Sequence, residues 1–364
     1  MPDAANSQED HDQGEEGEDD EGISWFAVPT LGSSPETGFY LGAAGLLVFP
    51  TNAPPEVAQR TSLDAEFQVT LRRQVRLDNA LVLVLGQGDW LVDVGLHLGI
   101  EPDFFYGVGN NTPTDFERYD ARSVSTDTGF KRALGASRRL YAGAFYHFNA
   151  IAIEPEPGGR LATAAAPGVT GGLISAPGVE LYWDGRDSAL VPRAGSFLNV
   201  KLQRASALLG SDFAFTRTIF DARHYLALGR DHVLAGRALL NLGIGDVPVF
   251  EMGMLGGETL MRGTYRGRFR DRSLAAVQGE YRSPLIWRLR FNVFTALGQV
   301  GPNIADLIPS TDVKWTTGLG TRIKIDEEVY IRVDWATLLA DRSAQGKGFG
   351  IEETGFYISA NEAF

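Results

Sequence analysis

The chain has 364 residues, a formal net charge of −13, 43 glycines and no cysteine. The lack of cysteine excludes disulfide scaffolds, cysteine-based zinc sites and thiol nucleophiles. The acidic balance disfavours nucleic-acid binding. No uninterrupted apolar run reaches the roughly 18 residues of a transmembrane helix.

The chain begins with an acidic segment, residues 1–22, which contains ten Asp and Glu residues and no Lys or Arg. Those ten account for −10 of the net charge of −13, so the remainder carries −3. A segment with this composition cannot bury enough apolar surface to fold, and we expect it to be disordered. It also lacks the basic and apolar regions of a secretory signal. We therefore divide the chain into a disordered acidic tail, 1–22, and a folded body, 23–364.

From residue 23 onward, apolar and polar residues alternate with period two, which is typical of β-strands with one apolar face. In residues 62–72, Leu63, Phe67 and Leu71 share one face, while the other face is polar. Turn signals divide the body into about 16 strands, the usual size range for a membrane barrel. The predicted strands are 24–32, 37–49, 61–72, 75–86, 89–101, 117–131, 137–152, 172–185, 196–207, 212–227, 231–244, 274–285, 288–300, 314–325, 328–339 and 353–364.

Short links such as 132–136 and 286–287 alternate with long ones at 102–116, 153–171 and 245–273. Alternating short turns and long loops are typical of an up-and-down antiparallel barrel in the outer membrane. A soluble sandwich or propeller is the alternative. It requires a polar exterior, and a propeller also requires a repeat of about 40–50 residues, which is not seen. We therefore predict an all-β transmembrane barrel of about 16 strands.

The two end strands, 24–32 and 353–364, would meet at a seam. Pro29 removes one backbone donor from the first of them, which weakens pairing there. The last strand ends in Phe364, which is similar to the terminal aromatic signal of bacterial outer-membrane barrels.

The segment 254–285 reads MLGGETLMRGTYRGRFRDRSLAAVQGEYRSPL. It holds a Met-Arg-Gly motif at 261–263, a Gly-Arg-Phe-Arg-Asp motif at 267–271, and a strand beginning Gly-Glu-Tyr-Arg at 279–282. Together with Ser-Pro-Glu-Thr-Gly at 34–38 and Gly-Leu-Gly-Thr-Arg at 318–322, this set resembles the BamA/TamA family, the bacterial surface antigen superfamily of outer-membrane assembly and translocation factors. The resemblance extends over about residues 24–364, and nothing before residue 23 would form the family's periplasmic POTRA repeats.

The resemblance implies that the sixth loop, 245–273, folds into the lumen and that Arg262 and Gly263 lock it there. Ala296 stands where the family places an inward aspartate. Period two puts Gln278, Glu280 and Arg282 on one face of their strand, as it does Arg332 and Asp334. Glu280 and Asp334 are therefore the expected partners of Arg262, because a guanidinium binds carboxylates through parallel hydrogen bonds. A basic cluster of Arg266, Arg268 and Arg270 is expected to face solvent or lipopolysaccharide phosphates.

The implied function is the insertion or transport of polypeptide or lipid at the outer membrane. A passive pore plugged by 245–273 and an adhesion or scaffolding barrel are the alternatives. The expected partners are outer-membrane lipids, lipopolysaccharide, and a client polypeptide or a separate periplasmic subunit. The chain has no Gly-x-Ser-x-Gly or His-Glu-x-x-His motif, so we expect no enzyme activity, no metal and no cofactor.

Overall fold

The computed structural model describes residues 23–364 except 55–56, 58, 190, 308–311, 326–329, 342–348 and 361–363. The predicted acidic tail, 1–22, lies outside the described residues. None of the helical segments in the described part is long and apolar enough to cross a membrane.

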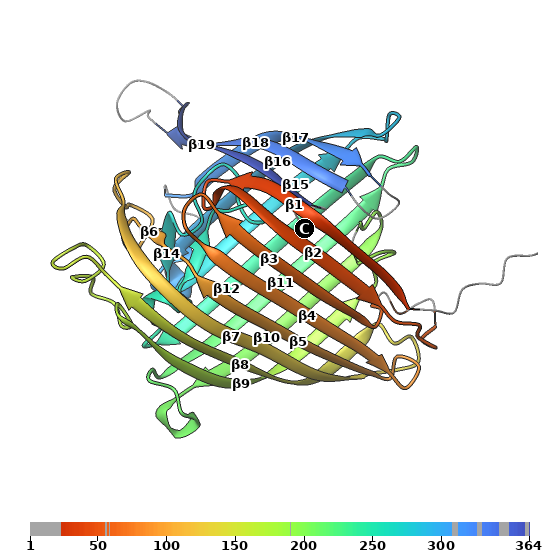
Figure 1. Ribbon diagram of the computed structural model, residues 1–364, viewed down its shortest axis with the longest axis horizontal. Helices are drawn as coiled ribbons and strands as arrows, with labels where there is room; N and C mark the ends of the chain where they lie inside the picture. The colour runs from red at the N-terminus through yellow and green to blue at the C-terminus, as the bar shows by residue number, and fades with distance from the viewer. Residues whose placement is uncertain are drawn as a thin grey trace, which may run out of the picture.

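Within the described residues, sixteen long antiparallel strands close into a barrel, as predicted (Figure 1). They are β1 (Ser24–Ser34), β2 (Gly38–Val48), β3 (Ser62–Thr70), β4 (Val75–Leu85), β5 (Trp90–Ile100), β7 (Glu117–Ala133), β8 (Leu140–Glu154), β9 (Gly171–Asp184), β10 (Gly195–Ala205), β11 (Phe215–Ala227), β12 (Val233–Gly245), β15 (Ser273–Arg282), β16 (Leu289–Gly301), β17 (Lys314–Lys324), β18 (Tyr330–Asp341) and β19 (Phe349–Ala360). The short β6 (Asp103–Phe105) pairs with β7, while β13 (Gly253–Leu255) and β14 (Phe269–Asp271) form a separate hairpin. The links between strands contain, in the part of the chain that the structure describes, three short 3-10 helices: η1 (Ala207–Leu209), η2 (Val249–Glu251) and η3 (Ile304–Leu307).

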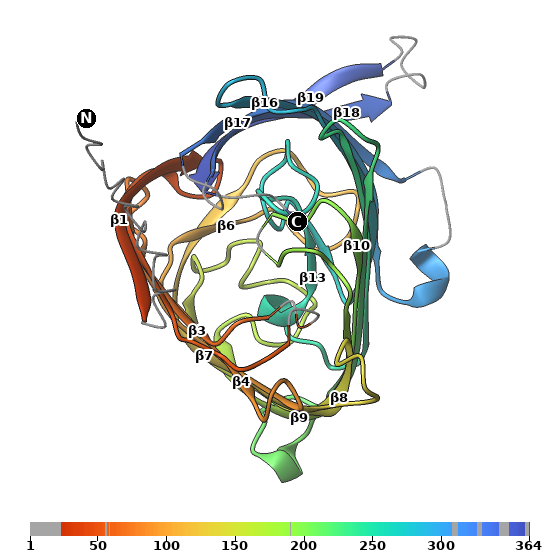
Figure 2. The ribbon, with the colours of Figure 1, turned by 90° about the vertical axis from the view of Figure 1, so that its right-hand side faces the viewer.

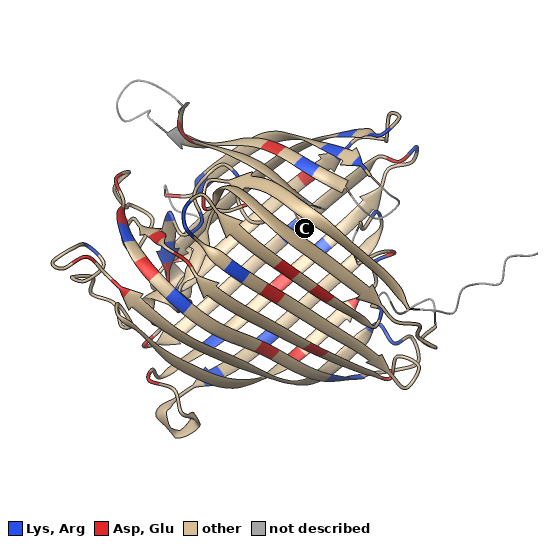
Figure 3. Ribbon diagram, in the orientation of Figure 1, with Lys and Arg blue, Asp and Glu red and all other residues tan. Residues whose placement is uncertain are grey.

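The alternating pattern places apolar side chains on the outside of the wall. Trp25, Leu31 and Phe39 expose 74%, 72% and 63% of their surfaces, which is expected of residues that face lipid and costly for residues that face water. Charged residues lie midway along several strands (Figure 3), and they pair on the inner face. Lys131, for example, is buried and binds Glu180 at 3.1 Å.

The barrel closes unevenly at the seam between β1 and β19. Every residue of β1, from Ser24 to Ser34, faces a partner on β2. On the β19 side, Ser33 opposite Ile358 is the one pair formed within the described residues. The last strand was predicted to reach residue 364, which is wrong: β19 ends at Ala360.

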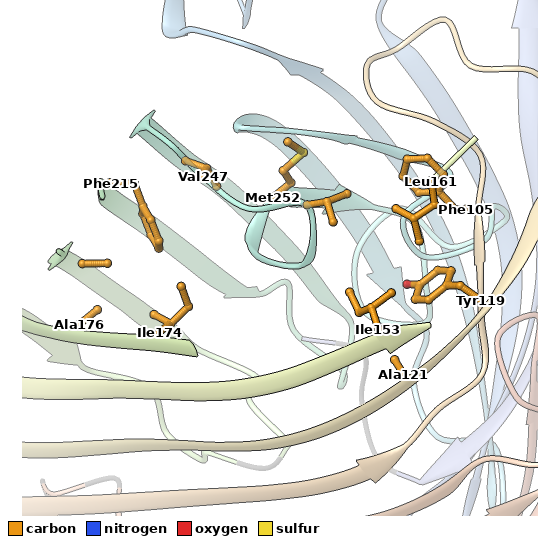
Figure 4. Close-up of a cluster of buried hydrophobic side chains, with 12 residues drawn as sticks. Phe105, Tyr119, Ala121, Ile153, Leu161, Ile174, Ala176, Phe215, Val247 and Met252 are labelled. Carbon is orange, nitrogen blue, oxygen red and sulfur yellow. The ribbon is translucent and has the colours of Figure 1, made fainter. Parts of the chain in front are cut away.

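Side chains of links and loops fill much of the lumen. One buried apolar cluster joins Phe105, Leu161 and Met252 from three long links to wall residues such as Ile174 and Phe215 (Figure 4). At the opposite end of the barrel, the link 49–61 packs Ala53 and Val57 against a cluster that includes Tyr141, Tyr182 and Phe197. The alternating pattern of the sequence did not predict that Ala53 and Val57 would pack against this cluster.

Candidate functional site

The sixth loop, residues 246–272 between β12 and β15 and hereafter called loop six, lies inside the barrel. It contains η2 and the β13–β14 hairpin. Figure 2, a view along the barrel, shows β13 within the ring of strands. Its buried side chains Leu255, Met261 and Phe269 pack against the wall residues Ala296 and Leu338. Ala296 therefore contributes apolar packing where the family resemblance would place a carboxylate.

Arg262 lies between two buried carboxylates, which together with it form what we call the lock: Arg262, Glu280 and Asp334. The Arg262 guanidinium donates to Asp334 Oδ2 at 2.5 Å and to Glu280 Oε2, and its carbon lies 3.4 Å from the centroid of the Phe294 ring. Arg262 is 3% exposed, and the side chains of Glu280 and Asp334 are fully buried. The structure thus brings together the three residues that the sequence singled out.

Further arginines surround the two carboxylates of the lock. Arg282 Nε donates to Glu280 Oε1 at 3.0 Å, and Arg322 Nη1 donates to Asp334 Oδ1 at 2.6 Å. Asn292 Nδ2 donates to Glu280 Oε1 at 2.8 Å. Buried charges are tolerated when they are paired and hydrogen-bonded in this way. The lock is therefore part of a larger ion network on the inner face of β15–β18.

The backbone beside Arg262 fits closely against the wall. A Cβ on Gly263, whose φ is +111°, would lie 2.7 Å from the Thr337 nitrogen, so a side chain there would collide with β18. Met261 is buried with a φ of 56°, a conformation that is uncommon for a residue with a side chain. Gln278 Nε2 donates to the Thr259 carbonyl at 3.0 Å, and this bond holds the backbone just before Arg262 against β15. Glycine at 263 and strain at 261 are consistent with a loop fixed by its surroundings.

The tip of loop six contacts both sides of the seam. On the β19 side, Gly263 N donates to the Tyr357 hydroxyl at 2.9 Å and Arg268 Nε donates to Glu353 Oε1 at 2.6 Å. On the β1–β2 side, Arg266 N donates to Glu36 Oε1 at 2.7 Å. Burial raises the pKa of Glu36, although the bond from Arg266 opposes that effect. Loop six thus bridges β19 and the β1–β2 turn, across a seam whose strands barely pair with each other.

The prediction that Arg266, Arg268 and Arg270 face outward is wrong for two of the three. Arg268 and Arg270 are each 1% exposed, and Arg266 is the exposed member. Arg268 lies between Glu353 and the Thr112 main chain, and Arg270 Nε donates to the Gly267 carbonyl at 3.2 Å. Oxygen atoms of the lumen take the place of water around these two guanidinium groups.

A second anchor holds the first part of loop six, and the sequence analysis did not predict it. Glu251, in η2, accepts hydrogen bonds from Arg217 Nη1 and, at 2.8 Å, from Asn149 Nδ2. His147 Nε2 lies 3.3 Å from the same carboxylate. Burial alone would raise the pKa of Glu251, but Arg217, His147 and Asn149 outweigh burial and hold this pKa well below its usual range. No local motif joins residues 147, 217 and 251, because the fold alone brings them together.

Replacing Glu251 with Gln should lower the stability of the folded barrel at pH 7 by about 1–3 kcal/mol, because Arg217 would lose its charged partner. A lowered folded-state pKa gives stability that is complete above the unfolded value and is lost as pH falls towards the folded value. The difference between Glu251→Gln and the parent should therefore shrink below about pH 4.5. Thermal unfolding in detergent between pH 3 and 8 measures this, and a difference that does not change with pH would contradict it.

Phe364 does not end a strand, so its predicted place in a terminal strand signal is wrong. It is buried against Tyr225 and Ala235, and Arg282 Nη2 donates to its main-chain oxygen at 2.9 Å.

Beside loop six there is also a polar cavity of about 670 Å³, whose walls include Glu66, Asp78, His97 and Arg237. The described residues hold no group of three or more His, Asp or Glu side chains suited to a metal ion.

Comparison with solved structures shows the same fold in several outer-membrane proteins. BamA from Haemophilus ducreyi lacking POTRA domains 1–3 is 11% identical, with a TM-score of 0.60 over 93% of this chain and 70% of that chain. CdiB from Escherichia coli is 12% identical, with a TM-score of 0.62 over 92% of this chain and 62% of that one. CdiB from Acinetobacter baumannii is 13% identical, with a TM-score of 0.55 and coverage of 93% and 60%. This chain thus spans less than two thirds of either CdiB chain.

A comparison with curated protein sequences finds no significant match. The family model described as the Omp85 superfamily domain matches residues 62–364, which is most of the chain. With the barrel fold, this match supports an outer-membrane location and a general role in assembly or translocation there. The chain belongs to the Omp85 superfamily.

Proposed function

We propose that this barrel inserts or transports polypeptide or lipid at the outer membrane, and that its cargo passes through the β1–β19 seam while loop six acts as the latch. The proposed role is not enzymatic. The proposed partners are a client polypeptide, a separate periplasmic subunit that captures it, and the surrounding lipids, including lipopolysaccharide.

The seam is the single observation that carries this proposal. Residues 24–32 of β1 have partners on β2 and none on β19 among the described residues. An unpaired strand edge is costly in lipid, because its N–H and C=O groups have no water to bond. Such an edge also presents a template on which another strand can pair. An unpaired β1 edge is therefore expected if the seam between β1 and β19 must open.

Loop six supplies the latch. Its contacts to Tyr357 and Glu353 hold β19, while its contact to Glu36 holds the β1–β2 turn. The lock secures the same loop to β15 and β18. Moving loop six would therefore release the seam from both sides, and a seated loop six would keep it closed.

A passive pore is the second candidate, favoured by the polar cavity of about 670 Å³ beside loop six. That cavity has charged walls, including Glu66 and Arg76, which suit a path for water and ions. The two candidates differ in what the cell loses when the protein is absent.

Depletion of the protein in its native cells, with quantitative proteomics and lipid analysis of the outer membrane, tests the proposal. We expect other outer-membrane proteins or lipids to fall, and this defect should be rescued by the parent chain but not by an empty vector. Purified protein should show small conductance while loop six is seated. Unchanged outer-membrane content combined with a steady, large conductance would favour the pore instead.

A further inference from the structure

Phe364 occupies a built site inside the barrel, at the end of β12 and β15 that lies away from loop six. Its side chain is 6% exposed and packs against Tyr225 of β11 and Ala235 of β12. Figure 2 shows the end of the chain within the ring of strands. The residue is therefore enclosed by the barrel rather than facing lipid.

Arg282 gives this site a fixed hydrogen-bond donor. Its side chain is fully buried, and Nη2 donates to the Phe364 main-chain oxygen at 2.9 Å. The other two nitrogens of the same guanidinium also donate hydrogen bonds, Nη1 to the Pro192 carbonyl at 3.2 Å and Nε to Glu280 Oε1 at 3.0 Å. The guanidinium carbon also lies 5.9 Å from the centroid of the Phe364 ring, within the range of a cation–π contact. A donor fixed in this way needs little rearrangement to bind.

Tyr225 provides a second and independent sign of a binding site. The residue is 1% exposed, and its hydroxyl has no hydrogen-bond partner within the described part of the chain. A buried hydroxyl without a partner destabilises the fold, so it is rarely kept without a reason. The site thus holds hydrogen-bonding capacity that Phe364 leaves unused.

We propose that this site binds an aromatic residue of a polypeptide by its ring and its main-chain oxygen, and that Phe364 occupies it as a tethered ligand until a client residue replaces it. The recognised groups are those of a peptide, since a lipid chain offers neither an aromatic ring nor a peptide carbonyl. This inference rests on the proposed function for polypeptide clients. It adds a place inside the lumen where such a client first binds.

A fluorescent, amidated hexapeptide with the sequence of residues 359–364, SANEAF, is the probe, and the same peptide ending in Ala is its matched control. The amide presents a main-chain oxygen and no free carboxylate. If Phe364 fills nine tenths of the sites, removing it should tighten the apparent affinity about tenfold. Anisotropy titration in detergent should therefore show SANEAF binding Phe364→Ala about tenfold more tightly than the parent, and SANEAA binding neither.

Arg282→Gln in the Phe364→Ala background should lose this binding. Arg282 also supports Glu280, so a second variant, Ala235→Leu in the same Phe364→Ala background, leaves Arg282 in place. Its larger side chain fills the space of the Phe364 ring, and it should lose the peptide binding as well. A heat-dependent shift in gel mobility checks that each variant is folded. Equal affinity of SANEAF for the parent and for Phe364→Ala, or equal binding of the two peptides, would overturn the proposal. The assay requires no opening of the seam, so its failure would leave the depletion result standing, and the reverse also holds.

Discussion

Arg262→Ala should release loop six from the inner wall and weaken its docking by about 3 kcal/mol. Removing one partner of a buried ion pair typically costs about 3–5 kcal/mol, because the remaining charge stays buried. The lower end applies here, since Arg282 and Arg322 still neutralise Glu280 and Asp334. Both carboxylates are fully buried, so contact with lumen water does not reduce the expected loss.

Limited proteolysis of the folded barrel measures this release, because cleavage within residues 246–272 should become fast in Arg262→Ala. Single-channel conductance should rise in parallel. Arg262→Lys should restore part of the protection, since an ammonium cannot span two carboxylates as a planar fork does. Arg272→Ala is the matched control from the same loop, because the hydrogen bond that Arg272 makes to Asp271 in the described part of the chain comes from its backbone nitrogen and not from its side chain. Equal protease resistance in Arg262→Ala and Arg272→Ala would contradict the lock.

Strand periodicity made the wall and the lock accessible from the sequence. Period two placed Glu280 beside Gln278 and Arg282 on one face, and Asp334 beside Arg332 on another. The register that brings the two carboxylates together could not be read in advance. Asp334 lies opposite Gly320, where a Cβ would collide with the Asp334 Oδ1 atom, so a glycine on the neighbouring strand makes the room.

The parts that escaped prediction depend on contacts between distant segments. The residues next to Glu251 in the sequence form no motif, because the fold alone brings Arg217 and His147 close to it. Arg268 and Arg270 sit in a polar, arginine-rich stretch that suggests exposure, yet Glu353 and main-chain oxygens enclose them. Phe364 follows an alternating strand, but hydrogen bonding to Arg282 places it in the lumen. Alternation determines which face a residue takes within a strand, and it carries no information on how a loop or a chain end folds back.

A disulfide across the seam tests most directly the central claim that cargo passes between β1 and β19. Ser33 and Ile358 lie opposite each other there, and the chain contains no cysteine, so Ser33→Cys/Ile358→Cys can form one intended bond. Thr295→Cys/Thr317→Cys, across the continuous β16–β17 ladder, is the matched control. In depleted cells, the oxidised seam variant should fail to restore outer-membrane protein or lipid levels and should recover when a reductant is added, while the control variant should rescue in both states. Full rescue by the oxidised seam variant, with the disulfide confirmed by mass spectrometry, would contradict the account.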